Sequence, residues 1–475
     1  MRILLAASEC TPFSKTGGLG DVVSGLSQAL VKKGHQVSVF LPFYLKTKRS
    51  ILDNYEFIDA FQIPQGNQMI GCNILKDVRN GVDFYFVECG TYFERDGFYG
   101  YGDDEKRYSY FCQAVRKAIL RLELRPQIIH VNDWQTAILP LLCADAGMKF
   151  KSVLTIHNPL FQGYFNSFNL GNYLNIQEYY YSNGLLKFND QVSLLKGGIC
   201  TCDAITTVSI THARELLSDF QAFNGLGYIL NNRQSDMFGI VNGIDYDFFT
   251  PESDKFIEAN YDIRTYKDGK YLNKEAVLKA FGFDTKDIDK PLFAAISRLT
   301  SQKGVHRILR NLENIASRNA RLIILGQGDY DIERQLKEMQ AKYPDNIRIY
   351  LGYNEELSHL IYAGSDFFLM PSMFEPCGLG QIIAMHYGSL PIVSKVGGLN
   401  DTVNSYFDNK KTATGFSFAS WDENCFDYSI NLAIDMYYNK NKDLDTMIKN
   451  AMKADFSWAK QSDEYIELYQ YLLNR

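Results

Sequence analysis

Residues 1–42 read MRILLAASECTPFSKTGGLGDVVSGLSQALVKKGHQVSVFLP and predict a strand, a helix and a second strand. The run RILLAAS is short, apolar and typical of a buried parallel strand. From Asp21 to Lys33 apolar residues recur at helical spacing, and Gly34 marks the end of that helix. The segment is therefore a βαβ unit, with the glycine-rich loop SKTGGLG at 14–20 following its first strand.

The same alternation continues along the chain and then begins a second time. A first series of strands is expected at 81–89, 127–133, 152–157, 204–209 and 238–243, with a long helix at 104–123. After a polar, weakly patterned stretch that ends near Lys290, further strands are expected at 291–297, 320–326, 347–352, 366–371 and 390–394. Alternation of this kind indicates parallel sheets with helices on both faces.

The chain therefore predicts an α/β fold of two doubly wound, Rossmann-like domains that face each other across a cleft. We expect domains at 1–245 and 246–455, and a C-terminal helix at 456–475 that could pack back on the first domain. The Tyr- and Asn-rich insertion at 158–190 is either a covering loop with buried aromatics or a lid or sugar-binding surface. Ligands of such sheets bind outside the carboxyl ends of the strands.

Composition narrows the class of protein. The chain has 475 residues, 46% of them hydrophobic, and a net charge of -6, which argues against nucleic acid and membrane partners. Its nine cysteines form no CxxC pair, so we expect reduced thiols. Because no signal segment or membrane span is recognisable, we expect a cytoplasmic protein.

The glycine-rich loop departs from the dinucleotide-binding fingerprint. With Gly18 and Gly20 as the first two glycines, Val23 stands where the third belongs, and the second strand ends without an acidic residue for a ribose. A dinucleotide-dependent oxidoreductase is therefore disfavoured. The glycines either let backbone N–H groups and Lys15 approach an anion, or only form a tight turn.

Two loops of the second domain contain the groups that a nucleotide diphosphate sugar needs. In SRLTSQKG, at 297–304, Arg298 and Lys303 can meet on one diphosphate. In PSMFEPCGLGQIIAMHYG, at 371–388, Glu375 can accept bonds from sugar hydroxyls while the start of the following helix takes a phosphate.

Eight motifs together resemble those of bacterial glycogen synthases and plant starch synthases, the glucosyltransferases of GT-B architecture. The motifs, in chain order, are SKTGGLGDVV, VNDWQTA, TIHNPLFQG, VNGIDYD, SRLTSQKG, GYNEE, PSMFEPCGLGQ and VGGLNDTV. The resemblance extends from Arg2 to about Trp458.

The resemblance implies a role for each matching residue. Lys15 lies by the donor sugar, Arg298 and Lys303 hold the donor diphosphate, Glu375 contacts the transferring glucose, and Asp133 and His157 line the reaction centre. The residues implied to bind substrate or nucleotide are Gly17, Gly18, Asp21, Asn158, Asn242, Tyr353, Cys377, Gly378, Leu379 and Gly380. No metal and no cofactor is implied. Without the family context, His157 would be a buried core histidine, Asp133 a helix N-cap and Tyr353 a half-exposed strand-end aromatic.

The implied reaction is transfer of glucose from ADP-glucose to the non-reducing end of an α-1,4-glucan, such as glycogen or a malto-oligosaccharide, with retention of configuration. The alternatives are a GT-B transferase with another donor or acceptor, and a catalytically silent glucan-binding protein. Gly380, Met373 and Gln135 replace a threonine, an arginine and a histidine that are common in the family, and Ile383 stands where the broader E-x7-E pattern has its second acid. The departures bear on donor affinity and donor choice.

Overall fold

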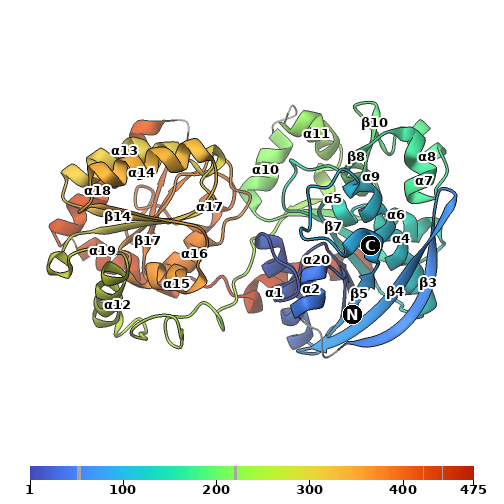
Figure 1. Ribbon diagram of the computed structural model, residues 1–475, viewed down its shortest axis with the longest axis horizontal. Helices are drawn as coiled ribbons and strands as arrows, with labels where there is room; N and C mark the ends of the chain where they lie inside the picture. Colours follow the sequence, from blue (N-terminus) through green and yellow to red (C-terminus); the bar gives the residue numbers. More distant parts are fainter. Residues whose placement is uncertain (51–54, 219–221, 421, 441) are drawn as a thin grey trace. The chain divides into compact units, whose positions relative to one another are not determined.

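The computed structural model describes residues 1–50, 55–218, 222–420, 422–440 and 442–475. The chain forms two compact units (Figure 1). Unit 1 comprises Met1–Gly243 and Trp458–Arg475, and unit 2 comprises Ile244–Ser457. The last segment of the chain therefore belongs to unit 1.

Unit 2 is built on a six-stranded, fully parallel sheet in the order β15-β14-β13-β16-β17-β18. Numbered within the unit, this is the strand order 3-2-1-4-5-6 of the Rossmann fold. The strands are β13 (Leu292–Ile296), β14 (Arg321–Gly326), β15 (Ile347–Leu351), β16 (Phe367–Met370), β17 (Leu390–Ser394) and β18 (Phe416–Phe418).

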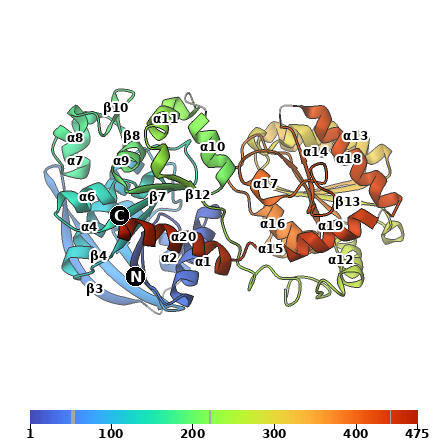
Figure 2. The same ribbon diagram turned by 180° about the vertical axis from the view of Figure 1, so that it is seen from behind.

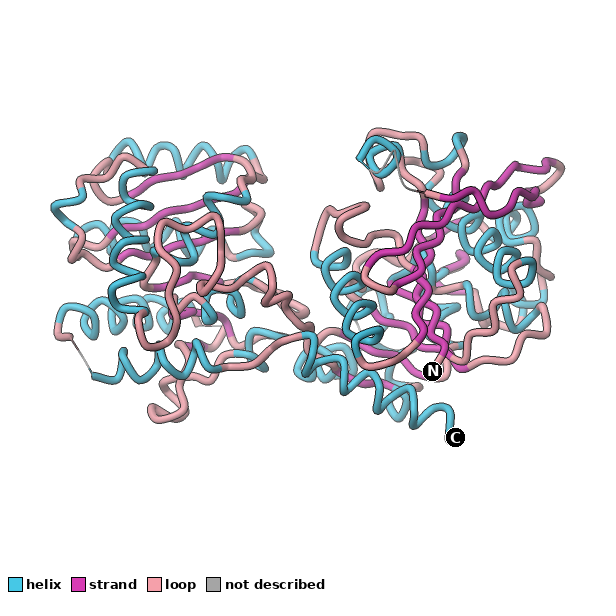
Figure 3. Tube along the Cα trace, turned by 90° about the horizontal axis from the view of Figure 1, so that it is seen from below, coloured by secondary structure: helices cyan, strands magenta, loops and turns pink. Residues whose placement is uncertain are grey.

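Helices cover both faces of this sheet (Figures 1 and 3). One layer holds α13 (Val305–Ser317), α14 (Tyr330–Lys342) and α18 (Glu423–Tyr438). The other holds α12 (Tyr266–Ala280), α15 (Glu355–Gly364), α16 (Gly380–His386) and α19 (Lys442–Lys453), and the short α17 (Gly397–Thr402) follows β17.

Helix α12 lies in the stretch whose sequence is polar and weakly patterned. Its buried face includes Lys270 and Lys274 beside Val277 and Leu278. The Lys270 amino group is satisfied by three backbone carbonyls, and that of Lys274 by Asp366 and two other acceptors. Because buried lysines interrupt the apolar pattern, hydrophobic spacing did not predict this helix.

Unit 1 has a nine-stranded sheet in the order β12-β11-β7-β6-β1-β2-β5-β4-β3. Its parallel strands are β1 (Arg2–Ala6), β2 (Gln36–Pro42), β5 (Val82–Glu88), β6 (Ile128–Asn132), β7 (Lys151–Ile156), β11 (Ala204–Thr207) and β12 (Met237–Gly239). The hairpin of β3 (Glu56–Gln65) and β4 (Gln68–Arg79) adds two antiparallel strands. The expectation of a purely parallel sheet is therefore wrong at this edge.

Successive residues of β1 enter different cores, because side chains alternate across a sheet. Ile3 and Leu5 pack with α1 (Gly18–Lys32) and α20 (Trp458–Asn474), whereas Leu4 and Ala6 face the opposite core. The opposite face is covered by α4 (Asp104–Arg121), α5 (Asp133–Thr136), α6 (Leu139–Asp145) and α9 (Leu194–Thr201).

The C-terminal helix α20 packs beside α1 within unit 1 (Figure 2). The indole of Trp458 lies so close to Gly25 that a Cβ there would be 1.9 Å from its nitrogen. Lys33 at the end of α1 pairs with Asp463. The last helix is therefore an integral part of the unit 1 core.

The insertion at 158–190 folds into small elements over this unit. They are β8 (Tyr164–Phe165), β9 (Lys187–Phe188), α7 (Leu170–Leu174) and α8 (Tyr179–Ser182), and β10 (Gln191–Ser193), directly after the insertion, pairs with β8 and β9. Phe165 and Phe188 are buried, while Phe161 and Phe168 are 62% and 74% exposed. The segment thus both covers the core and presents aromatic surface.

The remaining helices of unit 1 are α2 (Leu45–Ser50), α3 (Gly90–Phe93), α10 (Ile210–Ser218) and α11 (Ala222–Asn231). Within the described ranges, no helix combines the length and the apolar character needed to cross a bilayer. All nine cysteines carry free thiols.

Candidate functional site

In both units several site residues follow strands at the switch point of the sheet. Unit 1 reverses its strand order between β1 and β6, and unit 2 between β13 and β16. Glu9 and Lys15 follow β1, Asp133 follows β6, Arg298 follows β13 and Glu375 follows β16. These are the places where open α/β sheets bind ligands.

The glycine-rich loop of unit 1 is held by a carboxylate that the sequence interpretation did not include. Glu9 is 3% exposed, and it accepts hydrogen bonds from the backbone N–H groups of Thr16 and Gly17 and, at 2.7 Å, from the Thr16 hydroxyl. The hydroxyl of Tyr99 donates to Glu9 at 2.7 Å and lies 2.8 Å from the hydroxyl of Ser8, which can donate to it. These donors are thus already paired with Glu9.

The loop's glycines are not explained by backbone strain. Gly17 has a φ of -153°, and a Cβ built there would meet no atom within 4 Å. Gly18 begins α1, and neither residue is among the glycines with positive φ. Since the fold requires no glycine at 17, the open space beside it is available to a ligand.

Lys15 is exposed at the start of this loop. Its amino group pairs with the Asp21 carboxylate at 2.9 Å, and Asp21 also accepts a bond from the Thr11 hydroxyl at 3.0 Å. With 44% and 32% of the two side chains exposed, the pair is weak enough to open for an anionic ligand.

Asp133 sits in a strained, buried position after β6. Its φ is 54°, in the left-handed region that non-glycine residues seldom adopt. Its Oδ1 accepts bonds from the backbone N–H groups of His157 at 2.7 Å and Asn158 at 3.2 Å. Burial, with a smaller contribution from Glu9, raises the Asp133 pKa to about 7. Because Asn132 is the N-cap of α5, the interpretation of Asp133 as an N-cap is wrong.

His157 is joined to the same group through its ring. Its Nε2 lies 3.0 Å from Oδ1 of Asn132. Burial lowers the His157 pKa to about 3, so the imidazole is neutral at physiological pH. The structure therefore brings Asp133, His157 and Asn158 together.

Asn242 is not linked by any direct contact to this group. It is 5% exposed, and its Oδ1 is buried without a hydrogen-bond partner among the residues that the structure describes. An unpaired buried amide oxygen is costly to leave unsatisfied.

In unit 2, Lys303 and Glu375 form a largely buried ion pair. Their charged atoms are 2.6 Å apart, with 18% and 8% of the two side chains exposed. Ser372 donates a further bond to the same carboxylate oxygen at 3.1 Å. Backbone contact brings the loops together, because the Met373 N–H donates to the Gln302 carbonyl at 2.9 Å.

Gly304 makes this approach possible. Its φ is 68°, and a Cβ there would lie 1.9 Å from the Pro371 carbonyl oxygen. Arg298, which precedes Gly304 in the same loop, is exposed, and no partner of its guanidinium is found within the described ranges. The cluster thus combines one paired cation with one available cation.

The loop from Cys377 to Gly380 leads into α16. Gly378 has a φ of 76°, and the Gln381 amide donates to the carbonyls of Cys377 at 3.1 Å and Gly378 at 3.0 Å. Leu379 is the N-cap of α16, so Gly380 is its first residue. The N–H of Gly398 donates to the Glu375 carbonyl at 3.2 Å, which fixes the loop from its other side.

Tyr353 stands apart from this cluster at the end of β15. Its ring is 64% exposed, and its hydroxyl donates to Glu355. A flat, exposed aromatic at a strand end suits stacking on a base. It is more exposed than the half-exposed aromatic that the sequence alone indicates.

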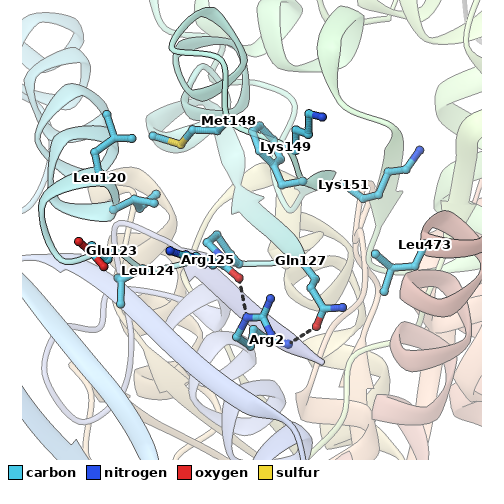
Figure 4. Close-up of a pocket in the computed structure, with 13 residues that line it drawn as sticks. Arg2, Leu120, Glu123, Leu124, Arg125, Gln127, Met148, Lys149, Lys151 and Leu473 are labelled. Atoms are coloured by element: carbon cyan, nitrogen blue, oxygen red, sulfur yellow. Dashed lines mark hydrogen bonds between the residues drawn. The ribbon is translucent and has the colours of Figure 1, made fainter.

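The pocket drawn in Figure 4 is a separate feature of unit 1. It has a volume of about 750 Å³ and lies at the amino ends of β1, β6 and β7, where Arg2, Gln127 and Lys151 line it. The predicted site residues follow the opposite, carboxyl ends of these strands. Its cations Arg125 and Lys149 are exposed, and solvated side chains of this kind do not define a site.

Glu9, Tyr99 and Ser372 are the neighbours that sequence reasoning missed. For Glu9 a signal existed, because an acid directly follows the buried run ILLAAS. Ser372 lies only three residues before Glu375 in the motif PSMFEPCGLGQ, whereas Tyr99 gave no signal, since its contact with Glu9 joins residues far apart in the chain. Within the part of the chain that the structure describes, no group of three or more His, Cys, Asp or Glu side chains could hold a metal ion.

The chain is similar to known proteins over its whole length. The model of the starch synthase catalytic domain matches residues 2–232, and that of glycosyl transferases group 1 matches residues 279–454. Glycogen synthases of Anoxybacillus flavithermus and Clostridium botulinum are each 39% identical to the chain, over 100% of it and over 98% and 100% of their own lengths. The chain belongs to the glycogen and starch synthase family.

Solved structures agree with this membership. The chain is 33% identical to the catalytic domain of starch synthase IV from Arabidopsis thaliana, which was solved bound to ADP and acarbose, with a TM-score of 0.90. The match covers 100% of the chain and 99% of that structure. A sucrose-phosphate synthase from Thermosynechococcus elongatus, 16% identical with a TM-score of 0.63, covers 100% of the chain and 99% of that structure and shares the fold. The chain is a glycosyltransferase enzyme of GT-B fold.

Proposed function

We propose that the protein transfers glucose from ADP-glucose to the non-reducing 4-hydroxyl of an α-1,4-glucan, with retention of configuration. In this step the bond between the anomeric carbon and the diphosphate breaks and the bond to the acceptor oxygen forms. The products are ADP and a glucan longer by one glucose, and the proton of the acceptor hydroxyl is released with the ADP. The observation that carries the proposal is the 39% identity to glycogen synthases over the full chain.

The charges of unit 2 suit the departing diphosphate. Negative charge grows on the leaving group as the glycosidic bond breaks, and fixed cations stabilise that charge. Arg298 is available for the diphosphate, and Lys303 can share its charge between Glu375 and a phosphate oxygen. Glu375 then remains to accept bonds from glucose hydroxyls.

The polar groups of unit 1 suit the sugar. The neutral imidazole of His157 can bond a hydroxyl without placing a positive charge beside the developing oxocarbenium ion. The Asp133 carboxyl fixes the backbone of His157 and Asn158. Lys15 supplies a cation from the glycine-rich loop. Ile383, which is buried, offers no second carboxylate in unit 2.

One incubation tests the proposal against its alternatives. The purified protein is mixed with glycogen and either ADP-glucose or UDP-glucose, and the released nucleotide diphosphate and the glucan chain length are measured. We expect ADP release and chain extension with ADP-glucose. Release only from UDP-glucose would identify another donor, and glucan binding without any release would identify a silent binding protein.

A further inference from the structure

Asn132, the last residue of β6, lies between the His157 ring and the end of β1. It is 2% exposed. Its Nδ2 donates to the carbonyl oxygen of Ala6 at 3.2 Å, and its Oδ1 lies 3.0 Å from Nε2 of His157. One short amide side chain therefore connects the end of β1 to the candidate site.

The Ala6 carbonyl decides which way this amide points. A carbonyl oxygen can only accept, so the Asn132 group that faces it must be the NH₂. The opposite arrangement would set two oxygens against each other in a buried position. Oδ1 is therefore the atom that faces His157.

An amide oxygen likewise can only accept, so the His157 nitrogen that faces it must carry the proton. In a neutral imidazole one nitrogen donates and the other accepts. Nδ1 of His157 is then a bare acceptor, and no partner for it is found within the described ranges.

We propose that Asn132 is a positioning residue that fixes His157 as the Nε2–H tautomer and so presents Nδ1 as an acceptor for a substrate hydroxyl. The tautomer assignment stands on the geometry of Ala6, Asn132 and His157. Its catalytic consequence rests on the proposed function, in which His157 contacts the sugar.

The surroundings hold the ring neutral, as the assignment requires. The titratable groups nearest to it are Asp133, whose carboxyl accepts the His157 backbone N–H, Glu9, which faces Asp133, and His130 below it in the sheet. His130 is occupied by Tyr469 and Thr155, each at 2.6 Å, and burial lowers its pKa to about 3.

The test reads the tautomer directly by ¹⁵N NMR of histidine-labelled, full-length protein, without substrate. We expect wild-type His157 to carry its proton on Nε2. In Asn132→Leu, which has similar volume but no acceptor, the proton should move to Nδ1 or divide between the nitrogens. Asn132→Asp keeps an acceptor at this position, so it should keep the Nε2–H tautomer and raise the His157 pKa.

Thr136→Val is the matched control. The Thr136 hydroxyl lies 3.2 Å from the Ala6 carbonyl and bonds the backbone N–H and carbonyl of Asn132 at 2.7 and 2.8 Å, but it contacts neither the Asn132 amide nor the ring, so its loss should leave the tautomer unchanged. A wild-type ring protonated on Nδ1, or an Nε2–H ring that persists in Asn132→Leu, would overturn the assignment. The wild-type spectrum alone decides this even if a variant does not fold.

Steady-state kinetics test the proposed role of His157 in the reaction separately from the tautomer assignment. Partners that orient metal-ligating histidines contribute roughly 10- to 100-fold, and by analogy Asn132→Leu should lose about tenfold or more in kcat, with KM for ADP-glucose little changed. A changed tautomer with unchanged kcat would refute the role of His157 in the reaction while leaving the tautomer assignment in place.

Discussion

The two clusters after the switch-point strands differ in how they are stabilised. In unit 1, hydrogen bonds hold the buried Glu9 and Asp133 and the partly exposed His157, and the pKa values of Asp133 and His157 lie far from their usual ones. In unit 2, Lys303 and Glu375 compensate each other's charge and Arg298 is exposed to solvent. The unit 1 cluster orients neutral and weakly charged groups, whereas the unit 2 cluster provides cations that can bind an anion.

The comparison implies that substitutions in the two clusters have different consequences. A change in unit 2 should mainly remove charge stabilisation of the leaving group. A change in unit 1 should mainly disturb orientation and the response to pH.

Lys303→Ala has the largest expected effect. Loss of one transition-state contact lowers kcat by about 10²- to 10³-fold. It also leaves the buried Glu375 carboxylate without its cation, at a cost of roughly 3 kcal/mol in the free energy of unfolding. Steady-state kinetics and urea denaturation measure the two effects.

The double variant Lys303→Met with Glu375→Gln is the control for the stability effect. It removes both charges, so stability should return towards that of the wild type while activity stays low. If Lys303→Ala retained wild-type activity, the assignment of this lysine to the diphosphate would be wrong.

Arg298→Ala should lower kcat by about 10²-fold without changing stability. The side chain is exposed, so its removal leaves no buried charge and the free energy of unfolding should change by less than about 0.5 kcal/mol. Lys337→Ala, at another exposed cation of unit 2, is the matched control and should change neither quantity. Equal activity of the two variants would contradict the proposed role of Arg298.

Much of this arrangement could be predicted from the sequence, because an apolar run that predicts a strand precedes each of these motifs. The apolar runs before Lys15, Asp133, Arg298 and Glu375 predict strands, and parallel strands gather their carboxyl ends. The β3–β4 hairpin was not predicted, because its exposed edge lacks a continuous apolar run.

The contacts of Glu9 and Asn132 could not be predicted either. The contact of Glu9 with Tyr99 and both contacts of the Asn132 side chain join residues far apart in the chain, and no spacing encodes their geometry. The two lysines of α12 illustrate the same limit, because their buried amino groups are satisfied only by tertiary contacts.

Gly17→Ala tests whether a ligand uses the space beside the glycine-rich loop of unit 1. The position has an extended backbone and free space, so stability should stay within about 0.5 kcal/mol of wild type. If the space receives the donor, a methyl group there should lower kcat/KM for ADP-glucose about tenfold. Gly25→Ala, which collides with Trp458, should instead destabilise the fold. Unchanged kinetics in Gly17→Ala would show that no ligand uses this space.

Asp133 contributes a pH dependence to the stability of the fold. Its pKa of about 7 lies above the value of about 4 in the unfolded chain, so the unfolded state loses this proton first as pH rises. Stability should therefore fall between about pH 4 and pH 7 and level off above that range.

Asp133→Asn keeps an acceptor for the two backbone N–H groups and removes the titration. Relative to the wild type, the variant should gain on the order of 2 kcal/mol between pH 5 and pH 8. Thermal unfolding of both proteins across this range measures the difference. Parallel pH profiles would mean that Asp133 titrates at its ordinary pKa.

The proposal that unit 2 binds the diphosphate while unit 1 contacts the sugar is tested most directly by calorimetric titration of ADP into wild type, Arg298→Ala and Asp133→Asn. ADP carries the diphosphate but no glucose. We expect Arg298→Ala to weaken ADP binding about tenfold or more, because a charge-assisted contact is lost, and Asp133→Asn to bind ADP like the wild type. Unchanged affinity in Arg298→Ala together with a large loss in Asp133→Asn would contradict this proposal.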